Sequence, residues 1–245
     1  MRIQEDGMSK DIEMFLEFAT SGRVVVFDTE TTGGSCSDEI CQLAAAEYVN
    51  GRLERTMNVY IRPTCEMNPW AEQVHGISMD YLDEHGIDPV DALHQFFDFL
   101  GSDVLLVAHN NRFDLKMLQQ ECAKFDCAFE PEGVEMCDTL ALARYFRPDL
   151  KSHALGNLLG PLGVDGVNSH DALDDVMACA GVFFKLLARH SKFASTANFI
   201  RGVTPRDGVV CRESSRIASR NAVACGRGAV EWSARRIAFG GAIMV

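Results

Sequence analysis

The sequence predicts an α/β domain built on a mixed β-sheet. Two runs of β-branched and other apolar residues, 23–28 (RVVVFD) and 103–109 (DVLLVAH), are typical of strands that are covered on both faces. The segments 40–49 and 52–62 flank Asn50-Gly51, the dipeptide most typical of a tight hairpin turn. Because helical and strand patterns alternate after this hairpin, we expect it to lie beside parallel strands in one five-stranded sheet flanked by helices.

The remaining elements follow from hydrophobic periodicity and from residues typical of helix ends. Residues 8–20 place Ile12, Phe15, Leu16 and Ala19 on one stripe, which predicts a short amphipathic helix. The short helix expected at 70–75 is followed by a small turn that contains a glycine. The other expected elements are helices at 70–75, 90–100, 111–126, 139–146, 153–160 and 170–189 and a short strand at 134–138.

Charge divides the chain into unlike parts. The 245 residues carry a net charge of −12, but residues 191–245 contribute +6 and residues 1–190 contribute −18. We expect an N-terminal helical extension at 1–21, a folded α/β domain at 22–190 and a basic, flexible tail rich in Arg, Ala, Gly and Ser at 191–245. An acidic surface of this kind argues against binding polyanions unless cations intervene.

Cysteine usage and hydropathy bear on the compartment. The nine cysteines are scattered, contain no C-x-x-C pair and lack histidines at zinc-ligand spacing. This pattern favours free thiols in a reducing compartment over a disulfide framework or a structural zinc site. The N-terminus lacks the apolar run of a signal peptide, and no stretch reaches the roughly 20 apolar residues of a membrane span. We therefore expect a cytoplasmic protein that does not enter the membrane.

Asp28 and Glu30 stand at the end of the first buried strand, in FDTETTGG. Two positions apart on a strand, both side chains leave the same face. Two neighbouring carboxylates repel each other unless a cation lies between them, and oxygen ligands of this kind suit Mg²⁺ or Mn²⁺. The alternative is a pair of solvated acids at a strand end.

Further acidic residues follow the other elements. Asp114 comes just after the second buried strand, where it either caps the following helix or joins Asp28 and Glu30 in the crevice at the carboxyl ends of the strands. In SHDALDDV, Asp171 and Asp175 share one face of the last predicted helix, and His170 stands just before it, one turn and a residue from Asp175. Histidine is the side chain suited to accepting a proton near neutral pH.

Three segments in this order resemble the motifs of the DnaQ-like, DEDDh 3′→5′ exonucleases: FDTETTG, N-x-x-F-D at 110–114, and H-x-A-x-x-D at 170–175. VHGIS at 74–78 and CDTLALAR at 137–144 also resemble segments of this family. The resemblance covers about residues 22–190 and is closest to the proofreading, epsilon-type exonucleases of bacterial DNA polymerase III. It implies a ribonuclease H-like fold.

The resemblance also implies roles for individual residues. Asp28, Glu30, Asp114 and Asp175 would hold two Mg²⁺ or Mn²⁺ ions, and His170 would be the general base. The resemblance further implies that the terminal nucleotide meets four other residues, one of which, His75, would otherwise only order the VHGIS turn. Asp138 is interpreted as a helix cap and not as a ligand. The four expected substrate contacts are Thr31, His75, Asn110 and Phe113.

The function that the resemblance implies is release of 5′-mononucleotides from single-stranded or frayed 3′ ends of DNA in proofreading or repair. One alternative keeps this chemistry and trims the 3′ ends of RNA. Another is a binding module without catalysis that docks on a DNA polymerase subunit through the tail at 191–245. The partners that we expect are the 3′ end of DNA, or of RNA, and a DNA polymerase subunit bound through the tail.

Overall fold

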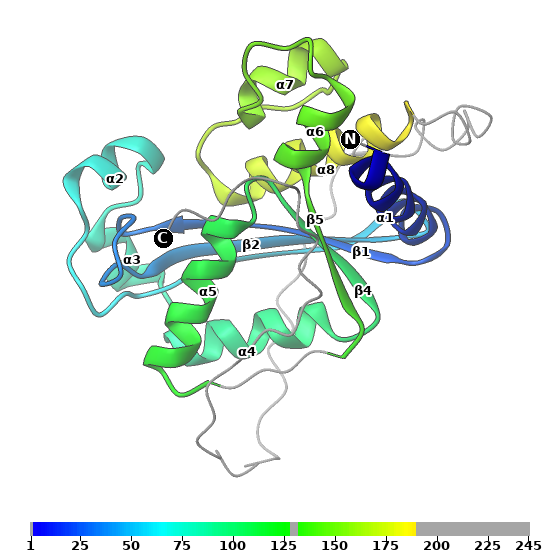
Figure 1. Ribbon diagram of the computed structural model, residues 1–245. Helices are drawn as coiled ribbons and strands as arrows, with labels where there is room; N and C mark the ends of the chain where they lie inside the picture. Colours follow the sequence, from blue (N-terminus) through cyan, green and yellow to red (C-terminus); the bar gives the residue numbers. More distant parts are fainter. Residues whose placement is uncertain (1, 128–131, 190–245) are drawn as a thin grey trace.

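The computed structural model describes residues 2–127 and 132–189, which form one mixed sheet with helices on both faces (Figure 1). Within these residues five strands are arranged in the order β3-β2-β1-β4-β5. This confirms the predicted α/β class and the mixed sheet. The strands are β1 (Arg23–Thr31), β2 (Ile40–Val49), β3 (Arg52–Tyr60), β4 (Val104–Ala108) and β5 (Val134–Asp138).

The pairing is antiparallel on one side of β1 and parallel on the other. β1 runs antiparallel to β2 and parallel to β4, and β5 continues the parallel half. The predicted hairpin between β2 and β3 turns at Asn50 and Gly51, which adopt φ angles of 50° and 72°. Both angles are positive, as a type I′ turn requires, which explains the Asn-Gly dipeptide.

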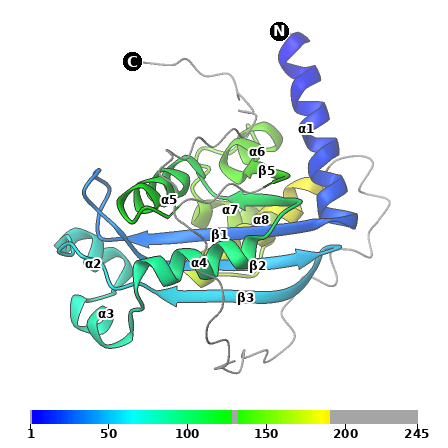
Figure 2. The same ribbon diagram turned by 90° about the horizontal axis from the view of Figure 1, so that it is seen from below.

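The helices form two layers and a small group at one end of the sheet. Helices α4 and α5 lie on one face, whereas α1, α6, α7 and α8 lie on the other, and α2 and α3 lie beyond the carboxyl end of β1 (Figures 1 and 2). The bounds are α1 (Arg2–Ser21), α2 (Pro69–His75), α3 (Met79–His85), α4 (Pro89–Leu100), α5 (Arg112–Lys124), α6 (Thr139–Phe146), α7 (Leu155–Leu162) and α8 (Ala172–Leu187).

Alternation along β1 separates two hydrophobic cores. Val24 and Val26 pack with α8 and with Phe15 of α1, while Val25 and Phe27 pack with α4 and α5. This alternation of buried side chains is that of a central strand covered on both faces, as predicted. It also determines which face each polar residue at the end of β1 will meet.

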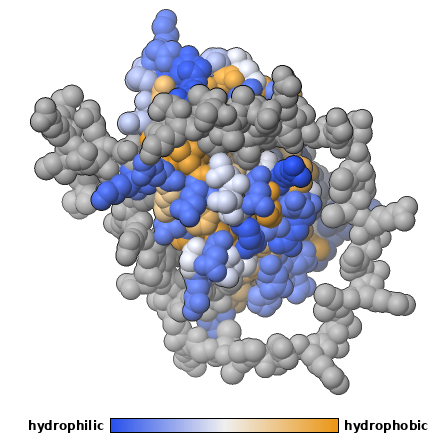
Figure 3. All heavy atoms as spheres, turned by 90° about the vertical axis from the view of Figure 1, so that its right-hand side faces the viewer, coloured by the Kyte–Doolittle hydropathy of each residue, from blue (hydrophilic) through white to orange (hydrophobic). Residues whose placement is uncertain are grey.

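Among the described helices, none combines the length and apolar character needed to cross a bilayer. At the end of the sheet remote from the carboxyl end of β1, hydrophilic side chains dominate the visible surface, with smaller hydrophobic patches between them (Figure 3). The predicted tail at 191–245 lies outside the described residues, and the domain boundaries proposed from composition stay predictions.

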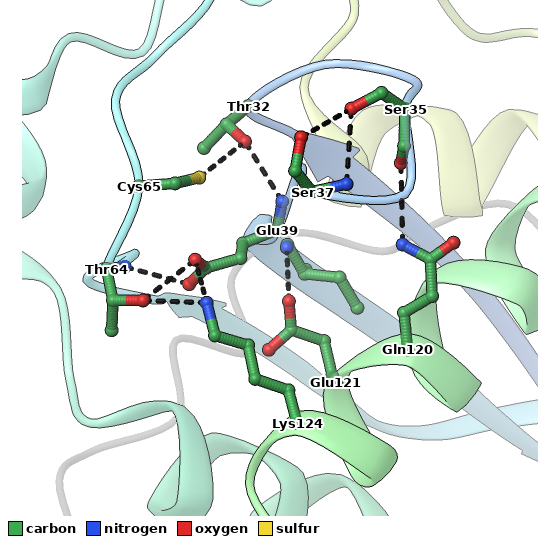
Figure 4. Close-up of polar contacts among 10 residues, drawn as sticks. Thr32, Ser35, Ser37, Glu39, Thr64, Cys65, Gln120, Glu121 and Lys124 are labelled. Atoms are coloured by element: carbon green, nitrogen blue, oxygen red, sulfur yellow. Dashed lines mark hydrogen bonds and ion pairs between the residues drawn. The ribbon is translucent and has the colours of Figure 1, made fainter.

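A cluster of buried polar groups connects the loop before β2 to α5 (Figure 4). Glu39, 2% exposed, forms an ion pair with Lys124 and accepts hydrogen bonds from the backbone N and Oγ1 of Thr64 at 2.8 and 2.9 Å. Glu121, 3% exposed, accepts a hydrogen bond from the backbone N of Ile40 at 2.9 Å. Burial and the charge of Glu39 raise the pKa of Glu121 to about 7, although the bond from Ile40 and the charge of Lys124 oppose this.

Glu121→Gln should therefore stabilise the protein in a pH-dependent way. Because the folded state holds the Glu121 proton more tightly than the unfolded chain does, stability is lost as pH rises from about 4.3 to about 7. Glutamine keeps the acceptor for Ile40 and removes this titration. We expect a free energy of unfolding higher by about 1–3 kcal/mol at about pH 8, and nearly unchanged at about pH 4.

Urea titrations at both pH values measure this difference. Glu54→Gln, a change of an exposed carboxylate on β3, is the matched control and should give the same small difference at both pH values. A Glu121→Gln effect of equal size at both pH values would show that Glu121 is ionised throughout.

Candidate active site

The end of β1 places two carboxylates on the α8 side of the sheet. Asp28 and Glu30 share the face of Val24 and Val26, as their spacing predicted. Both carboxylates are partly buried, and neither side chain forms a hydrogen bond or an ion pair with any residue in the described part of the chain. Partly buried carboxylates without protein partners are costly unless a cation neutralises them.

Asp114 is held against the same strand from α5. It is 4% exposed and accepts hydrogen bonds from the backbone N and Oγ1 of Thr29 at 3.2 and 2.8 Å. The alternative expectation that Asp114 caps α5 is wrong, because Asn111 occupies the N-cap position. Thr29 points to the α5 face of the alternating strand, so a residue between Asp28 and Glu30 positions the third carboxylate.

The start of α8 supplies the last two residues of the predicted site. Asp171 is the N-cap, and its carboxylate accepts hydrogen bonds from the backbone N of Leu173 and of Asp174. Asp175, 6% exposed, accepts hydrogen bonds from Asn168 and from the backbone N of Ser169. His170 precedes the cap with a φ of 58°, a left-handed conformation that is uncommon outside glycine and often found at functional sites.

These elements bring the predicted residues together. The ligand atoms of Glu30, His170 and Asp175 all lie within 4.8 Å of one another. Burial, together with the charges of Asp114, Glu30 and Asp175, raises the pKa of Asp28 well above its ordinary value. Burial and the charges of Asp175 and Asp114 raise the pKa of Glu30 to about 8. The repulsion behind these shifts is relieved by a divalent cation, and the oxygen donors fit Mg²⁺ or Mn²⁺.

The pKa values of Asp114 and Asp175 are raised as well. Burial raises the pKa of Asp114 to about 7, although the hydrogen bonds from Thr29 oppose the shift. Burial also raises the pKa of Asp175, while the hydrogen bond from Asn168 and the charge of His170 lower it. The four carboxylates and His170 thus form a site that can hold a metal ion.

His75 connects the VHGIS turn to the end of β1. Its Nδ1 accepts a hydrogen bond from the backbone N of Ile77 at 3.0 Å, so the proton of the neutral ring lies on Nε2. Nε2 lies 3.3 Å from the carbonyl oxygen of Thr31 and donates to it. Thr31 itself donates from Oγ1 to the carbonyl oxygen of Gly33 at 2.6 Å. His75 therefore orders its own turn and fixes Thr31, and its contact with a nucleotide stays a prediction.

Asn110 lies between β4 and α5, and Phe113 lies in the first turn of α5. Asn110 is exposed, has a φ of 64° and donates its backbone N to Asp138 at 2.9 Å. Asp138 also caps α6 by accepting from the backbone N of Leu140, which confirms its interpretation as a helix cap. Phe113 is partly buried against the α4–α5 core. The role of these side chains toward a nucleotide stays a prediction.

Two residues beside the candidate site were not recognised in the sequence. His109 lines the same cavity as Asp28 and Asp175, and its Nδ1 lies 2.9 Å from the Oγ1 of Thr139. Its place directly before Asn110, at the carboxyl end of a predicted strand, was a signal that could have identified it. The second position is Gln42, on β2.

Gln42 is fully buried and holds the start of α8 to the sheet. Its Oε1 accepts from the backbone N of Ala172 at 3.2 Å, and its Nε2 donates to Asp171 at 3.1 Å and to Asn58 at 3.0 Å. Gln42 lies opposite Glu30 in the β1–β2 register. One amide therefore fixes the start of α8, which carries Asp175 and follows His170, relative to the strand that carries Glu30.

Fold and site together define an exonuclease. The chain belongs to the Exonuclease (RNase_T) family, whose model matches residues 25–183. The matched range contains the carboxylates at 28, 30, 114 and 175 and the histidine at 170.

The similar proteins are DNA polymerases of much greater length. The PolC-type DNA polymerase III of Oceanobacillus iheyensis is 32% identical over 166 residues, which are 67% of this chain and 11% of that protein. That of Listeria innocua is 34% identical over 184 residues, which are 72% of this chain and 12% of that protein. The chain thus spans only about a ninth of the curated relatives that it matches.

Solved structures of exonuclease I share the fold. The Escherichia coli enzyme in complex with a dA16 oligonucleotide has a TM-score of 0.61 at 21% identity, covering 71% of this chain and 42% of that one. The enzyme from Methylocaldum szegediense has a TM-score of 0.60 at 20% identity, covering 69% and 41%. The fold is accordingly ribonuclease H-like, as the motif resemblance implied.

Gln42→Met should slow the exonuclease without removing its metal site. Methionine matches the length of glutamine but leaves Ala172 and Asp171 without their buried partner, so we expect a loss of about 1–3 kcal/mol in the free energy of unfolding. Displacement of the start of α8 should lower kcat about 10–100-fold. Steady-state degradation of an oligonucleotide and urea unfolding measure the two effects.

The matched control is Asn58→Ala, which removes the third hydrogen-bond partner of Gln42 and leaves its bonds to Ala172 and Asp171 in place. Its kcat should stay close to that of the unmodified protein. Equal losses of kcat in both variants would show that Gln42 acts through the sheet and not through α8.

Proposed function

We propose that this chain is a metal-dependent 3′→5′ exonuclease that releases 5′-mononucleotides from the 3′ ends of DNA. The observation that carries the proposal is the cluster of Asp28, Glu30, Asp114 and Asp175 beside His170, at the carboxyl ends of the central strands. The likeness to PolC-type DNA polymerases over most of the chain supports DNA as the substrate.

The carboxylates would hold two Mg²⁺ or Mn²⁺ ions, which when bound supply Lewis acidity for phosphodiester hydrolysis. His170 would accept the proton of the attacking water, because it lies beside Glu30 and Asp175 and is exposed to solvent. Thr29 would keep Asp114 oriented through its two hydrogen bonds.

Four residues would contact the terminal nucleotide. Thr31 and His75, connected by the bond between Nε2 and the carbonyl oxygen, would form one side of its pocket. Asn110, from the loop after β4, and Phe113, from the first turn of α5, would form the other side. A proofreading or repair role, a cytoplasmic location and docking on a polymerase subunit through 191–245 belong to the same proposal.

The test uses single-stranded DNA and RNA oligonucleotides of matched sequence, labelled at the 3′ or the 5′ end. We expect the full chain to shorten DNA from the 3′ end in Mg²⁺ or Mn²⁺, to release 5′-mononucleotides, and to stop when EDTA is added. The double variant Asp28→Asn with Glu30→Gln is the control for contaminating nucleases.

The other possible results of this digestion would each change the proposed function. Faster shortening of RNA than of DNA would favour the trimming of RNA ends. Loss of the 5′ label first would reverse the proposed polarity. No shortening at enzyme excess would overturn the proposal and favour a binding module without catalysis.

A further inference from the structure

A cavity of about 620 Å³ extends from the carboxylates toward the segment between α6 and α7. Asp28 and Asp175 lie at one part of its lining, and Asn110 and His109 continue from the end of β4. The remaining wall comes from α6 and from residues 151–155. Figure 1 shows α6 and α7 together on the α8 side of the sheet, beside the carboxyl end of β4.

Two cations on this wall have no anionic partner among the residues that the structure describes. Arg144 and Lys151 line the cavity and are exposed, and neither side chain forms a hydrogen bond or an ion pair within residues 2–127 and 132–189. By contrast, Arg147, between them in sequence, forms a bidentate pair with Asp149 at 2.8 Å. Residues 1–190 carry a net charge of −18, and these two cations lie beside the carboxylates of the candidate site, on one wall of the same cavity.

The segment that carries Lys151 is fixed to its surroundings. Arg147 donates to the carbonyl oxygen of Pro161 at 3.2 Å, and the ring of His153 bonds the carbonyl oxygen of Arg147 at 2.8 Å. Asn157 donates to the Oγ of Ser152 at 2.9 Å. A cation presented by an ordered segment loses less conformational entropy when it binds an anion.

We propose that Arg144 and Lys151 bind the backbone phosphates of the strand on the 5′ side of the scissile phosphate. This inference rests on the proposed function and adds to it a binding site for the part of the strand that is not cleaved off. When the scissile phosphate of a strand lies at Asp28 and Asp175, the rest of the strand passes along this cavity wall. Arg144 and Lys151 are the permanently charged cations among the described residues that line it. Arginine and lysine bind phosphate through charge-assisted hydrogen bonds.

The proposal predicts a selective loss in the double variant Arg144→Gln with Lys151→Gln. KM for a single-stranded DNA oligonucleotide should rise about tenfold or more, because two charge-assisted contacts are lost, while kcat changes little. The p-nitrophenyl ester of thymidine 5′-monophosphate has no second phosphate and should be hydrolysed as before. The slope of log affinity against log salt should fall by about 1.4, as expected for two contacts to a single strand.

The control variant is Arg52→Gln with Lys10→Gln, which changes the charge equally. Both residues are exposed and unpaired in the described part of the chain, Arg52 beside the β2–β3 turn and Lys10 on α1. This variant should keep the KM and the salt slope of the unmodified chain. An equal rise of KM in both variants would mean that overall charge, and not this wall, attracts the strand, and would overturn the proposal.

Fluorescence anisotropy of a labelled oligonucleotide in Ca²⁺ separates this proposal from the proposed function. Binding that depends on Arg144 and Lys151 in a chain that hydrolyses neither substrate would support the phosphate site and refute the exonuclease proposal. Unchanged oligonucleotide binding in the double variant would overturn the phosphate site, and would leave an acidic protein surface as the partner of these cations. An equal loss with both substrates would also overturn it.

Discussion

The variants Asp28→Asn and Asp175→Asn are each expected to lose about 10³-fold or more in the rate of oligonucleotide hydrolysis, which corresponds to about 4 kcal/mol of transition-state stabilisation. Each change removes one carboxylate from a cluster in which none of the four carboxylates forms an ion pair within the described residues. The affinity for Mn²⁺, measured by isothermal titration calorimetry, should fall with the rate.

The same substitutions should raise the stability of the metal-free protein. Burial and like charges raise the pKa of Asp28 well above its ordinary value, so the free energy of unfolding falls as pH rises above the pKa of the unfolded chain, and asparagine removes that cost. A rise of about 2–4 °C in the melting temperature in EDTA corresponds to about 1 kcal/mol. Activity and stability thus move in opposite directions, which a merely misfolded variant cannot show.

Asp174→Asn is the matched control for Asp175. Asp174 is the neighbouring residue on α8, accepts a hydrogen bond from Ser169 and is not among the charges that raise the pKa of Asp28 or of Glu30. It should keep its rate and its metal affinity. Similar losses at Asp174 and Asp175 would mean that the net charge of the helix start matters and that Asp175 is not a ligand.

His170→Gln should lower kcat about 10²–10⁴-fold, because the general base is lost while the carboxylates remain. Calorimetry with Mn²⁺ should show nearly unchanged metal affinity. This pattern distinguishes a general base from a metal ligand. The distinction matters because a ring nitrogen of His170 lies within 4.8 Å of a carboxylate oxygen of Glu30 and of Asp175.

His94→Gln, on the exposed side of α4, is the control for a general effect of losing a histidine. If His170→Gln abolishes metal binding as Asp175→Asn does, His170 is a ligand and another group takes the proton. A loss of less than about tenfold in kcat would remove His170 from the chemistry altogether.

Local sequence patterns were sufficient for most of the fold. The bounds predicted for β5 and α6 agree with the structure, because Asp138 ends one element and caps the next. The Asn50-Gly51 turn fixed the hairpin for the same reason, since its backbone conformation is encoded by two residues. Helix α3 was missed, because seven residues with a Ser78 cap carry too little periodicity to be separated from a turn.

Contacts between elements that are far apart in the sequence could not be predicted from local sequence patterns. The carboxylate spacing on β1 was read from the alternation of a strand, but the choice between cap and site for Asp114 depended on Thr29, 85 residues away. The contacts of Gln42 with α8 span 129 and 130 residues. Whether Arg144 and Lys151 form ion pairs likewise depends on which side chains surround them in the folded protein, so the sequence alone could not show that they are unpaired among the described residues.

The alternation of side chains along β1 couples activity to folding. The strand directs Asp28 and Glu30 to one face and Thr29, the partner of Asp114, to the other, between apolar residues that divide in the same way. A slip of one residue would send the carboxylates into the α4–α5 core and the apolar side chains to the metal site. Partly folded chains with the wrong strand pairing are thus unable to cut nucleic acid, and hydrolysis appears only with the native core.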